Sequence, residues 1–246
     1  MLVTAKSIGA YDAPERVAVY DRSMDIMHPN RHKMIQVALD VVPFHRDDEF
    51  RVLDIGAGTG FFVKQCLHDY PRATAVAIDG APAMRDIALQ RLGDAGSRMD
   101  YRIGDFRNIR ELAQHGGPYD LAVSAYALHH LDAGEKKALV ADVLAVLREG
   151  GWFLNADVIV GATEALERRF QDLRVAGIVD RAAGKDDRYC DPMTTRASLA
   201  AMEAGEGDQP LTLDADLKVL RDAGLAGVTV FWMEYREAVT GGHKSG

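Results

Sequence analysis

One glycine-rich segment constrains this chain more than any other, because it places a tight turn between an apolar run and a helix. Residues 51–62 read RVLDIGAGTGFF. Glycine allows backbone angles and close approaches that a Cβ would block. The turn is therefore predicted to lie against a flat ligand and to direct helix N–H groups toward it. Asp79 ends the next apolar run, 19 residues after Gly60, where a carboxylate can bind two ribose hydroxyls. The pattern predicts a nucleoside-bearing cofactor.

The spacing of the glycines separates two classes of cofactor. A dinucleotide-binding turn has the pattern G-x-G-x-x-G, in which the third glycine lets the helix pack on the strand. Here the spacing is G-x-G-x-G, and Phe61 and Phe62 follow. Asp54 lies two residues before the first glycine, where a carboxylate repels a pyrophosphate and attracts a cationic amino-acid group. An NAD oxidoreductase is thus a disfavoured alternative, and a turn without a ligand is another.

The segment from Val52 to Gly60 resembles motif I of the class I methyltransferases that depend on S-adenosylmethionine (SAM). Later segments resemble further motifs of that family in the same order: 76–84, 104–106, 119–131 and 147–154. The resemblance covers residues 40 to 160 closely and the C-terminal hairpin loosely. It implies SAM as the cofactor and methyl transfer as the activity.

The resemblance also implies roles for individual residues. The glycine turn would approach the methionine end, Asp54 would help to bind its ammonium group, and Asp79 would hold the ribose. Tyr126 would shield the sulfonium or pack on the cofactor, with plain core packing as the alternative. The full set of expected cofactor-binding residues is Tyr20, Asp54, Gly56, Ala57, Gly58, Gly60, Asp79, Gly80, Met84, Asp105, Phe106, Ser124 and Tyr126.

Strand and helix patterns alternate along the middle of the chain, which is typical of a parallel sheet covered on both faces. We expect an α/β, Rossmann-like class I methyltransferase fold. It would have a seven-stranded, mostly parallel sheet, an antiparallel C-terminal hairpin and a helical lid. The chain is interpreted as a single methyltransferase domain over 1–246. Its parts are N-terminal helices (1–50), the SAM-binding core (51–160), a helical lid insertion (161–211), and the last helix with the edge hairpin (212–246).

The expected elements have approximate bounds. Strands are predicted at 51–55, 74–79, 99–103, 119–124, 151–158, 228–232 and 235–240. Helices are predicted at 15–20, 29–42, 59–69, 82–93, 107–115, 134–148, 163–179, 193–204 and 213–223.

His129 and His130 are the candidate catalytic residues, because they follow the fourth predicted strand by a few positions. A neutral histidine can accept a proton near pH 7, although a general base is needed only where the acceptor loses one. The alternative is a helix start in which one histidine packs and bonds to the backbone. The two cysteines, Cys66 and Cys190, give no metal-ligand spacing, and no metal is expected.

The charge and composition of the chain limit the classes of molecule that it is expected to bind. The net charge of −8 argues against a nucleic-acid substrate, which needs a basic face. Residues 168–196 hold seven Lys or Arg and five Asp, which suggests a carboxylate-bearing acceptor, with paired surface charges as the alternative. No apolar run of about 18 residues is present for a membrane span, and residues 1–10 lack the apolar core of a signal peptide. A cytoplasmic location is predicted, as is a possible homodimer through the apolar edge at 228–232.

The function predicted from these patterns is SAM-dependent methyl transfer to O, N or C of a small molecule. Three segments, 17–20, 78–84 and 217–239, are similar to carboxy-S-adenosylmethionine synthase, so transfer of a carboxyl-derived unit to SAM is the alternative. Ser124 stands where that resemblance leads us to expect asparagine. An alternative of another class is a non-catalytic SAM-binding regulatory or partner protein. The sequence does not identify the acceptor.

Overall fold

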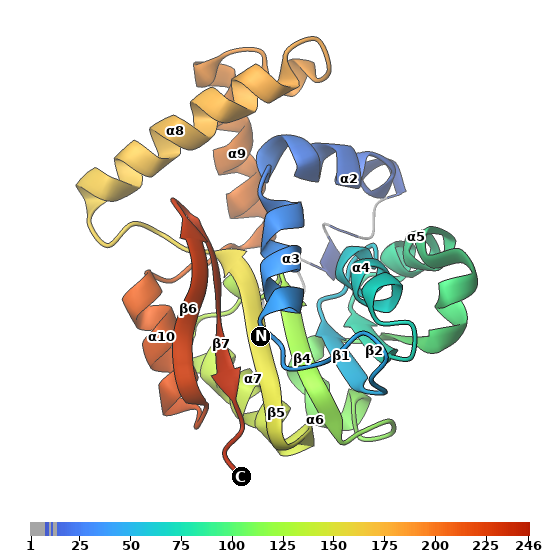
Figure 1. The fold of residues 1–246 in the computed structure, drawn as a ribbon. Helices are drawn as coiled ribbons and strands as arrows, with labels where there is room; N and C mark the ends of the chain where they lie inside the picture. Colours follow the sequence, from blue (N-terminus) through green and yellow to red (C-terminus); the bar gives the residue numbers. More distant parts are fainter. Residues whose placement is uncertain (1–7, 10, 12–13) are drawn as a thin grey trace.

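The structure, a computed structural model, describes residues 8–9, 11 and 14–246 (Figure 1). Within them, seven strands form one sheet in the order β3-β2-β1-β4-β5-β7-β6. Their bounds are β1 (Arg51–Ile55), β2 (Thr74–Asp79), β3 (Met99–Ile103), β4 (Tyr119–Ala125), β5 (Leu147–Val158), β6 (Ala226–Glu234) and β7 (Glu237–His243). The pairs among β1 to β5 are parallel, and β7 runs antiparallel to β5 and β6. The predicted sheet and hairpin are confirmed.

Helices cover both faces of this sheet, as an alternating pattern of strands and helices requires. The helices are α2 (Pro14–Met27), α3 (Arg31–Asp40), α4 (Phe61–Asp69), α5 (Pro82–Leu92), α6 (Ile109–Leu112), α7 (Ala133–Val146), α8 (Glu164–Ala182), α9 (Pro192–Glu206) and α10 (Leu213–Asp222). Successive strand residues point to opposite faces. Val52 therefore packs with α3 and α4, whereas Leu53 packs with α7 and α10. No helix in the described part of the chain is long and apolar enough to cross a membrane.

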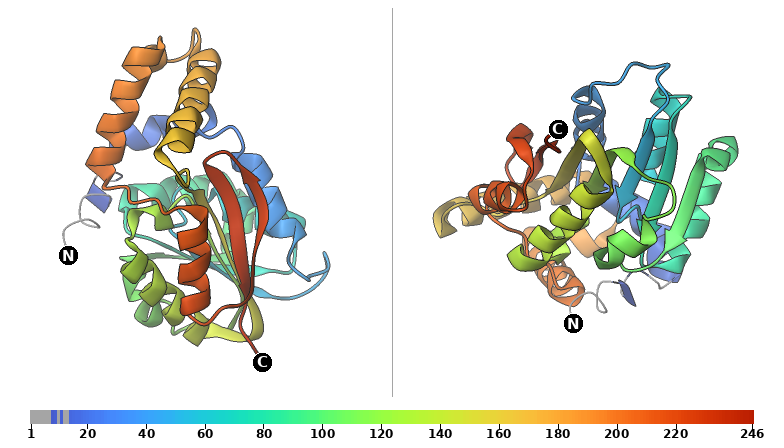
Figure 2. Two further views of the ribbon diagram at one scale, coloured as in Figure 1. Left: turned by 90° about the vertical axis from the view of Figure 1, so that its left-hand side faces the viewer. Right: turned by 90° about the horizontal axis from the view of Figure 1, so that it is seen from below.

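A separate helical layer stands beyond the carboxyl ends of the parallel strands. Helices α2, α8 and α9 make up this layer (Figures 1 and 2). A small apolar cluster holds it together, with Met24 and Met27 from α2, Ile178 from α8 and Leu199 from α9. The segment predicted as a lid therefore packs against the N-terminal helix, and the layer covers the edge of the sheet at which the glycine turn opens.

Several elements differ from their predicted bounds. Strand β5 begins at Leu147 instead of residue 151, and β6 extends over Ala226–Glu234 instead of 228–232. The structure gives a physical reason for α2 and α9. Helix α2 is longer than the segment expected at 15–20, because its second half packs on α8, a partner that the local pattern does not reveal. Helix α6 is a single turn instead of a helix over 107–115, and the backbone at Gly116 takes a positive φ of 128° soon after it. Helix α9 begins at Pro192, because Asp191 caps it by accepting from the N–H groups of Met193 and Thr194.

A buried ion pair joins two of the helices behind the sheet. The Lys136 Nζ of α7 donates to Asp216 Oδ1 of α10 at 2.8 Å, and the two side chains are only 2% and 3% exposed. Thr240 of β7 donates its hydroxyl to the other Asp216 oxygen at 3.1 Å. This pair thus connects α7, α10 and the inserted strand β7.

Strand β6 forms one edge of the sheet in the described structure. Its outer side is the surface through which a homodimer was predicted, since an edge strand presents unpaired backbone groups. No observation tests that assembly, and the homodimer stays a prediction.

Candidate functional site

The glycine turn between β1 and α4 takes left-handed backbone angles at three positions. The φ angles are 74° at Gly56, 51° at Gly58 and 71° at Gly60. A Cβ at Gly56 would overlap the Cβ of Ala127, and one at Gly60 would lie 2.9 Å from the Cβ of Ala88. At Gly58 it would meet no atom within 4 Å. Two of the glycines therefore allow the turn to pack against its neighbours, and Gly58 alone of the three leaves open space.

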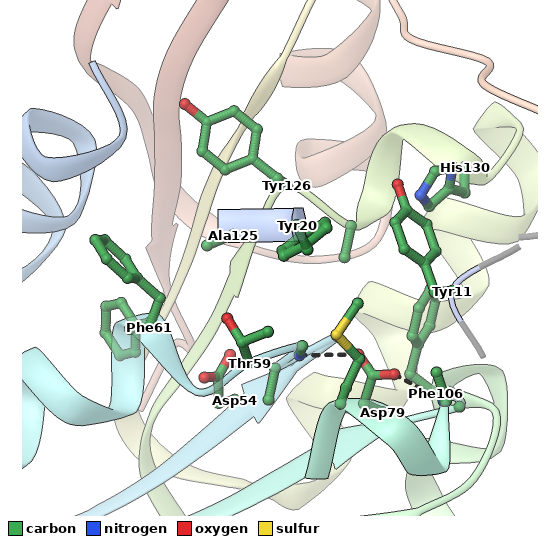
Figure 3. Close-up of a pocket in the computed structure, with 18 of the residues that line it drawn as sticks. Tyr11, Tyr20, Asp54, Thr59, Phe61, Asp79, Phe106, Ala125, Tyr126 and His130 are labelled. Carbon is green, nitrogen blue, oxygen red and sulfur yellow. Dashed lines mark hydrogen bonds between the residues drawn. The ribbon is translucent and has the colours of Figure 1, made fainter. Parts of the chain in front are cut away.

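The carboxylate of Asp79 holds this turn in place from the end of β2 (Figure 3). One oxygen accepts from the N–H of Gly58 at 2.9 Å, and the other accepts from the N–H of Ala81 at 2.8 Å. Burial raises the pKa of Asp79, and the nearby backbone N–H groups of Ala81, Gly58 and Gly80 offset part of that rise. A carboxylate has about four acceptor positions, so acceptor capacity for two hydroxyl groups remains.

Asp54 supplies a second buried carboxyl group to the same cavity. It is 1% exposed, and neither of its oxygens has a hydrogen-bond partner among the described residues. Burial, together with the nearby charge of Asp79, raises the pKa of Asp54 to about 8. Buried polar atoms are almost always bonded in folded proteins, so this unpartnered carboxyl marks a position where a polar or cationic ligand group would be stabilised.

The cavity above these two carboxyl groups contains nearly all of the expected cofactor-binding residues. It measures about 840 Å³ with its open mouth included. Eleven of the thirteen residues predicted to bind the cofactor line it: Tyr20, Asp54, Gly56, Ala57, Gly58, Asp79, Gly80, Met84, Asp105, Phe106 and Tyr126. The structure therefore brings together residues from the carboxyl ends of several strands, as expected for a ligand site on an open α/β sheet.

Two of the thirteen expected residues do not line the cavity. Ser124 does not line the cavity, because its buried hydroxyl donates to the carbonyl oxygen of Ile55 at 2.8 Å and ties β4 to β1. Its neighbour Ala125 lines the cavity instead, as the alternation along a strand requires. Gly60 is the N-cap residue of α4, and the absence of a Cβ lets it pack against Ala88 of α5.

Tyr126 lies between this cavity and a second one. Both cavities are lined by Tyr11, Tyr20, Met24 and Tyr126. The hydroxyl of Tyr126 donates to Glu237 Oε1 at 2.8 Å, and Glu237 also bonds to His28 at 2.9 Å and Asn30 at 3.1 Å. Burial alone would raise the pKa of Glu237, but the bonds from His28, Tyr126 and Asn30 hold it below its usual value. The wall between the cavities is therefore fixed by β7 and the segment before α3.

The two histidines lie at the boundary of the cavities. They form the short helix η3 (Leu128–His130), where both are buried. His130 lines the first cavity, whereas His129 and Asp208 line the second. His129 Nδ1 lies 2.6 Å from Asp157 Oδ1, and a carboxylate only accepts, so Nδ1 carries the hydrogen. His130 Nδ1 lies 3.0 Å from Asp208 Oδ1.

The pKa values of the two histidines shift in opposite directions. Burial acts to lower the pKa of His129, but the charge of Asp157 and its hydrogen bond outweigh burial and raise it. Burial and the neighbouring charge of His129 lower the pKa of His130. Unequal pKa values in adjacent groups are common at functional sites. Asp157 and Asp208 were not singled out from the sequence, although Asp157 is the last residue but one of β5, the strand beside β4.

Comparison with known proteins places these features in a family. Residues 52–151 match a family model described as a methyltransferase domain. An uncharacterized methyltransferase of Oceanobacillus iheyensis is 31% identical over 154 residues, which cover 63% of this chain and 67% of that protein. A malonyl-[acyl-carrier protein] O-methyltransferase of Halalkalibacterium halodurans is 24% identical over 169 residues, 68% of this chain and 61% of that protein. The match spans 61% to 67% of the length of such relatives.

Solved structures share the fold over most of the chain. An O-methyltransferase family protein from Burkholderia thailandensis matches with a TM-score of 0.68 and 21% identity, over 100% of this chain and 64% of that one. Human N-acetylserotonin methyltransferase in complex with SAM matches with a TM-score of 0.58 and 18% identity, over 96% of this chain and 58% of that one. At these identities the likeness shows the fold.

Proposed function

This chain belongs to the class I SAM-dependent methyltransferases, and we propose that it transfers the methyl group of SAM to a small-molecule acceptor in the second cavity. The observation that carries the proposal is the convergence of the glycine turn, Asp79 and Asp54 on the first cavity. Methyl transfer is an in-line displacement, so the main contribution of the protein is to align the two reactants. The two cavities adjoin at Tyr20, Met24 and Tyr126, which supports placing the two reactants side by side.

Within the first cavity, the lining residues fit the parts of SAM in turn. The remaining acceptor capacity of Asp79 suits the two ribose hydroxyls. Met84 and Phe106 offer apolar surfaces for the adenine, and the carboxylate of Asp105 lies at the same end. Asp54 suits the ammonium group, because an opposite charge would relieve the cost of burying its carboxylate.

For the acceptor, we propose a small molecule that bears a carboxylate. Arg174, Arg188 and Arg236 line the second cavity, and guanidinium groups bind carboxylates in a planar, two-point geometry. Two of these arginines contact Glu203, Arg174 at 2.5 Å and Arg236 at 3.6 Å. On binding an acceptor, they would exchange the carboxylate of Glu203 for that of the acceptor. The malonyl group in the name of the Halalkalibacterium relative is an acceptor of this chemistry.

The experiment that tests the function combines detection of the cofactor with an acceptor panel. Small molecules released from the purified protein are identified by mass spectrometry, and the protein is then incubated with methyl-labelled SAM and acceptors, starting with carboxylic acids. S-adenosylhomocysteine together with a labelled product would support the proposal. Tight SAM binding without any product would favour the non-catalytic alternative. Carboxy-S-adenosylmethionine in the released pool would favour carboxyl transfer.

Binding of SAM should release a proton from Asp54. Because the pKa of this carboxyl is about 8, the unliganded protein keeps it protonated at about pH 7. Pairing with the ammonium group requires the carboxylate, so about one proton should leave per SAM bound. Calorimetry in buffers with different ionisation enthalpies measures this number. It should fall to near zero for Asp54→Asn, and also for 5′-methylthioadenosine, which lacks the amino-acid end. Equal proton release by both ligands would contradict the assignment.

The raised pKa of Asp54 also determines whether the stability of the folded protein rises or falls with pH. The folded protein holds the proton up to about pH 8, whereas the unfolded chain loses it at the ordinary value of 3.8. The contribution of Asp54 to stability is thus fully present below 3.8 and is lost as the pH rises to about 8. Relative to Asp54→Asn, the stability of the wild-type protein without ligand should fall across this window.

Two alanine substitutions in the glycine turn should have different consequences. Both Gly56→Ala and Gly58→Ala force a side chain into the left-handed region, at a cost of about 1–2 kcal/mol. Gly56→Ala also overlaps Ala127, so its melting temperature should drop much further. Gly58→Ala should fold and yet lose SAM affinity, because its methyl group enters the open space of the cavity. Thermal unfolding and SAM titration separate the two effects, and full SAM affinity in Gly58→Ala would show that the ligand does not approach this turn.

A further inference from the structure

Three side chains at the boundary of the two cavities carry donor atoms of the kind that bind metal ions. His129, His130 and Asp208 each offer one donor atom, and the three atoms lie within 4.8 Å of one another. We propose that these residues hold a divalent transition-metal ion, of which Zn²⁺ is the representative. The binding site follows from the geometry alone, whereas its role in catalysis rests on the proposed methyl transfer.

His129 is oriented as a metal-bound histidine normally is. Its Nδ1–H donates to the buried carboxylate of Asp157 at 2.6 Å, which leaves the lone pair on Nε2 free to bind a cation. Metal-bound histidines commonly donate their other ring N–H to a carboxylate, which fixes the ring and increases the basicity of the ligand. The Nε2 atom lies 3.8 Å from Asp208 Oδ1, so the free lone pair is beside the next ligand.

His130 and Asp208 lie close together without forming a hydrogen bond. Their Nδ1 and Oδ1 atoms are 3.0 Å apart, yet both atoms are buried and have no hydrogen-bond partner among the described residues. Ligands at about 2.0–2.2 Å from a tetrahedral Zn²⁺ lie roughly 3–3.5 Å from each other. An ion between the two groups would satisfy both atoms at a separation close to the one observed.

The ligand types select the class of ion. Two imidazole nitrogens and one carboxylate suit Zn²⁺, Fe²⁺ or Co²⁺, whereas Mg²⁺ and Ca²⁺ prefer oxygen ligands. Three protein ligands leave at least one position open, as in catalytic zinc sites. His129 and Asp208 line the second cavity, so an oxygen of the acceptor can complete the coordination. The ion would favour the deprotonated form of that oxygen and fix its position.

The ion would also fasten the helical layer to the sheet. Asp208 belongs to the linker between α9 and α10, and the histidines follow β4. The neighbouring Gln209 already donates its N–H to the carbonyl oxygen of His129 at 2.7 Å. This bond holds Asp208 opposite the histidines, so the third ligand is supplied by the linker that joins the helical layer to α10.

The test measures binding of Zn²⁺ and Co²⁺ by protein that has been dialysed against a chelator. One tight site per chain is expected, with a visible Co²⁺ absorption band that Zn²⁺ displaces. Asp208→Asn and His130→Ala should each weaken binding at least tenfold. Asp157→Asn should weaken it by about 10- to 100-fold, because it removes the partner of a ligand. His68→Ala is the matched control, since His68 also lies 2.9 Å from a carboxylate, that of Asp69, but is exposed.

The outcomes separate this inference from the proposed function. No binding of Zn²⁺ up to on the order of 100 μM, or equal binding by the wild type and Asp208→Asn, would overturn the site. If Zn²⁺ binds but methyl transfer proceeds at full rate without metal, the function and the binding site stand and the catalytic role of the ion fails. If Zn²⁺ binds as expected but no acceptor is methylated, the site stands and the function fails. SAM titration of each variant verifies that its cofactor site is intact.

Discussion

Replacing Asp79 with alanine should raise the dissociation constant of SAM at least about 100-fold. Two hydrogen bonds from ribose hydroxyls to a charged acceptor contribute about 1.5–3 kcal/mol each. The substitution also removes the acceptors of the Gly58 and Ala81 N–H groups, at 2.9 and 2.8 Å. These bonds shape the turn that faces the ligand. The loss should therefore be larger than for any other single residue of the first cavity.

Isothermal titration calorimetry with SAM measures this effect, and a conservative variant refines it. Asp79→Asn keeps the size of the side chain and one acceptor oxygen, so its loss of affinity should be smaller. Asp86→Ala is the control, because this carboxylate on α5 is 77% exposed and lies near Arg85. An affinity of Asp79→Ala equal to that of the wild type would refute the ribose assignment.

Asp216→Ala should lower the free energy of unfolding by about 3–5 kcal/mol, because it leaves the buried charge of Lys136 without its partner. The pair is nearly inaccessible to solvent, at 2% and 3% exposure. Replacing both residues by apolar ones, as in Lys136→Met with Asp216→Leu, should recover most of the lost stability, since neither charge then remains buried. Urea unfolding, analysed as a double-mutant cycle, measures both quantities.

An exposed pair on the same helix provides the control for this prediction. Lys218 and Asp222 lie one turn apart on α10 with a 2.6 Å contact, but their side chains are 70% and 43% exposed. Surface pairs of this kind contribute about 0–1 kcal/mol, so Asp222→Ala should leave the unfolding midpoint almost unchanged. Equal effects at the two sites would mean that burial does not determine the strength of the pair.

The cofactor half of the site was predictable because its signals are local. The glycine turn and Asp79 follow two strands that are neighbours both in the chain and in the sheet, and an apolar run before each marks the strand. Gly60 and Ser124 show the limit of this reasoning, since their roles depend on α5 and on Ile55, which the motif does not specify.

The surroundings of the second cavity were not predictable, because the groups at its boundary meet only through tertiary structure. Asp208 reaches His130 from the linker after α9, and Glu237 reaches Tyr126 from β7, more than a hundred residues along the chain. No periodic pattern or spacing connects such positions. Asp157 is the exception, since it is the last residue but one of the strand beside β4 and so lies at the same edge of the sheet as the histidines.

The position of β7 between β5 and β6 has a consequence for the order of assembly during synthesis. Strands β1 to β5 and their helices leave the ribosome first, and they contain the whole glycine turn with Asp54 and Asp79. The free edge of β5 then stays unpaired until β7 has been synthesised. Strand β6 is made earlier, but it joins the sheet only by pairing with β7. The hairpin must therefore dock as a unit. The first cavity can thus form on the nascent chain before the hairpin supplies Glu237, which fixes the wall toward the second cavity.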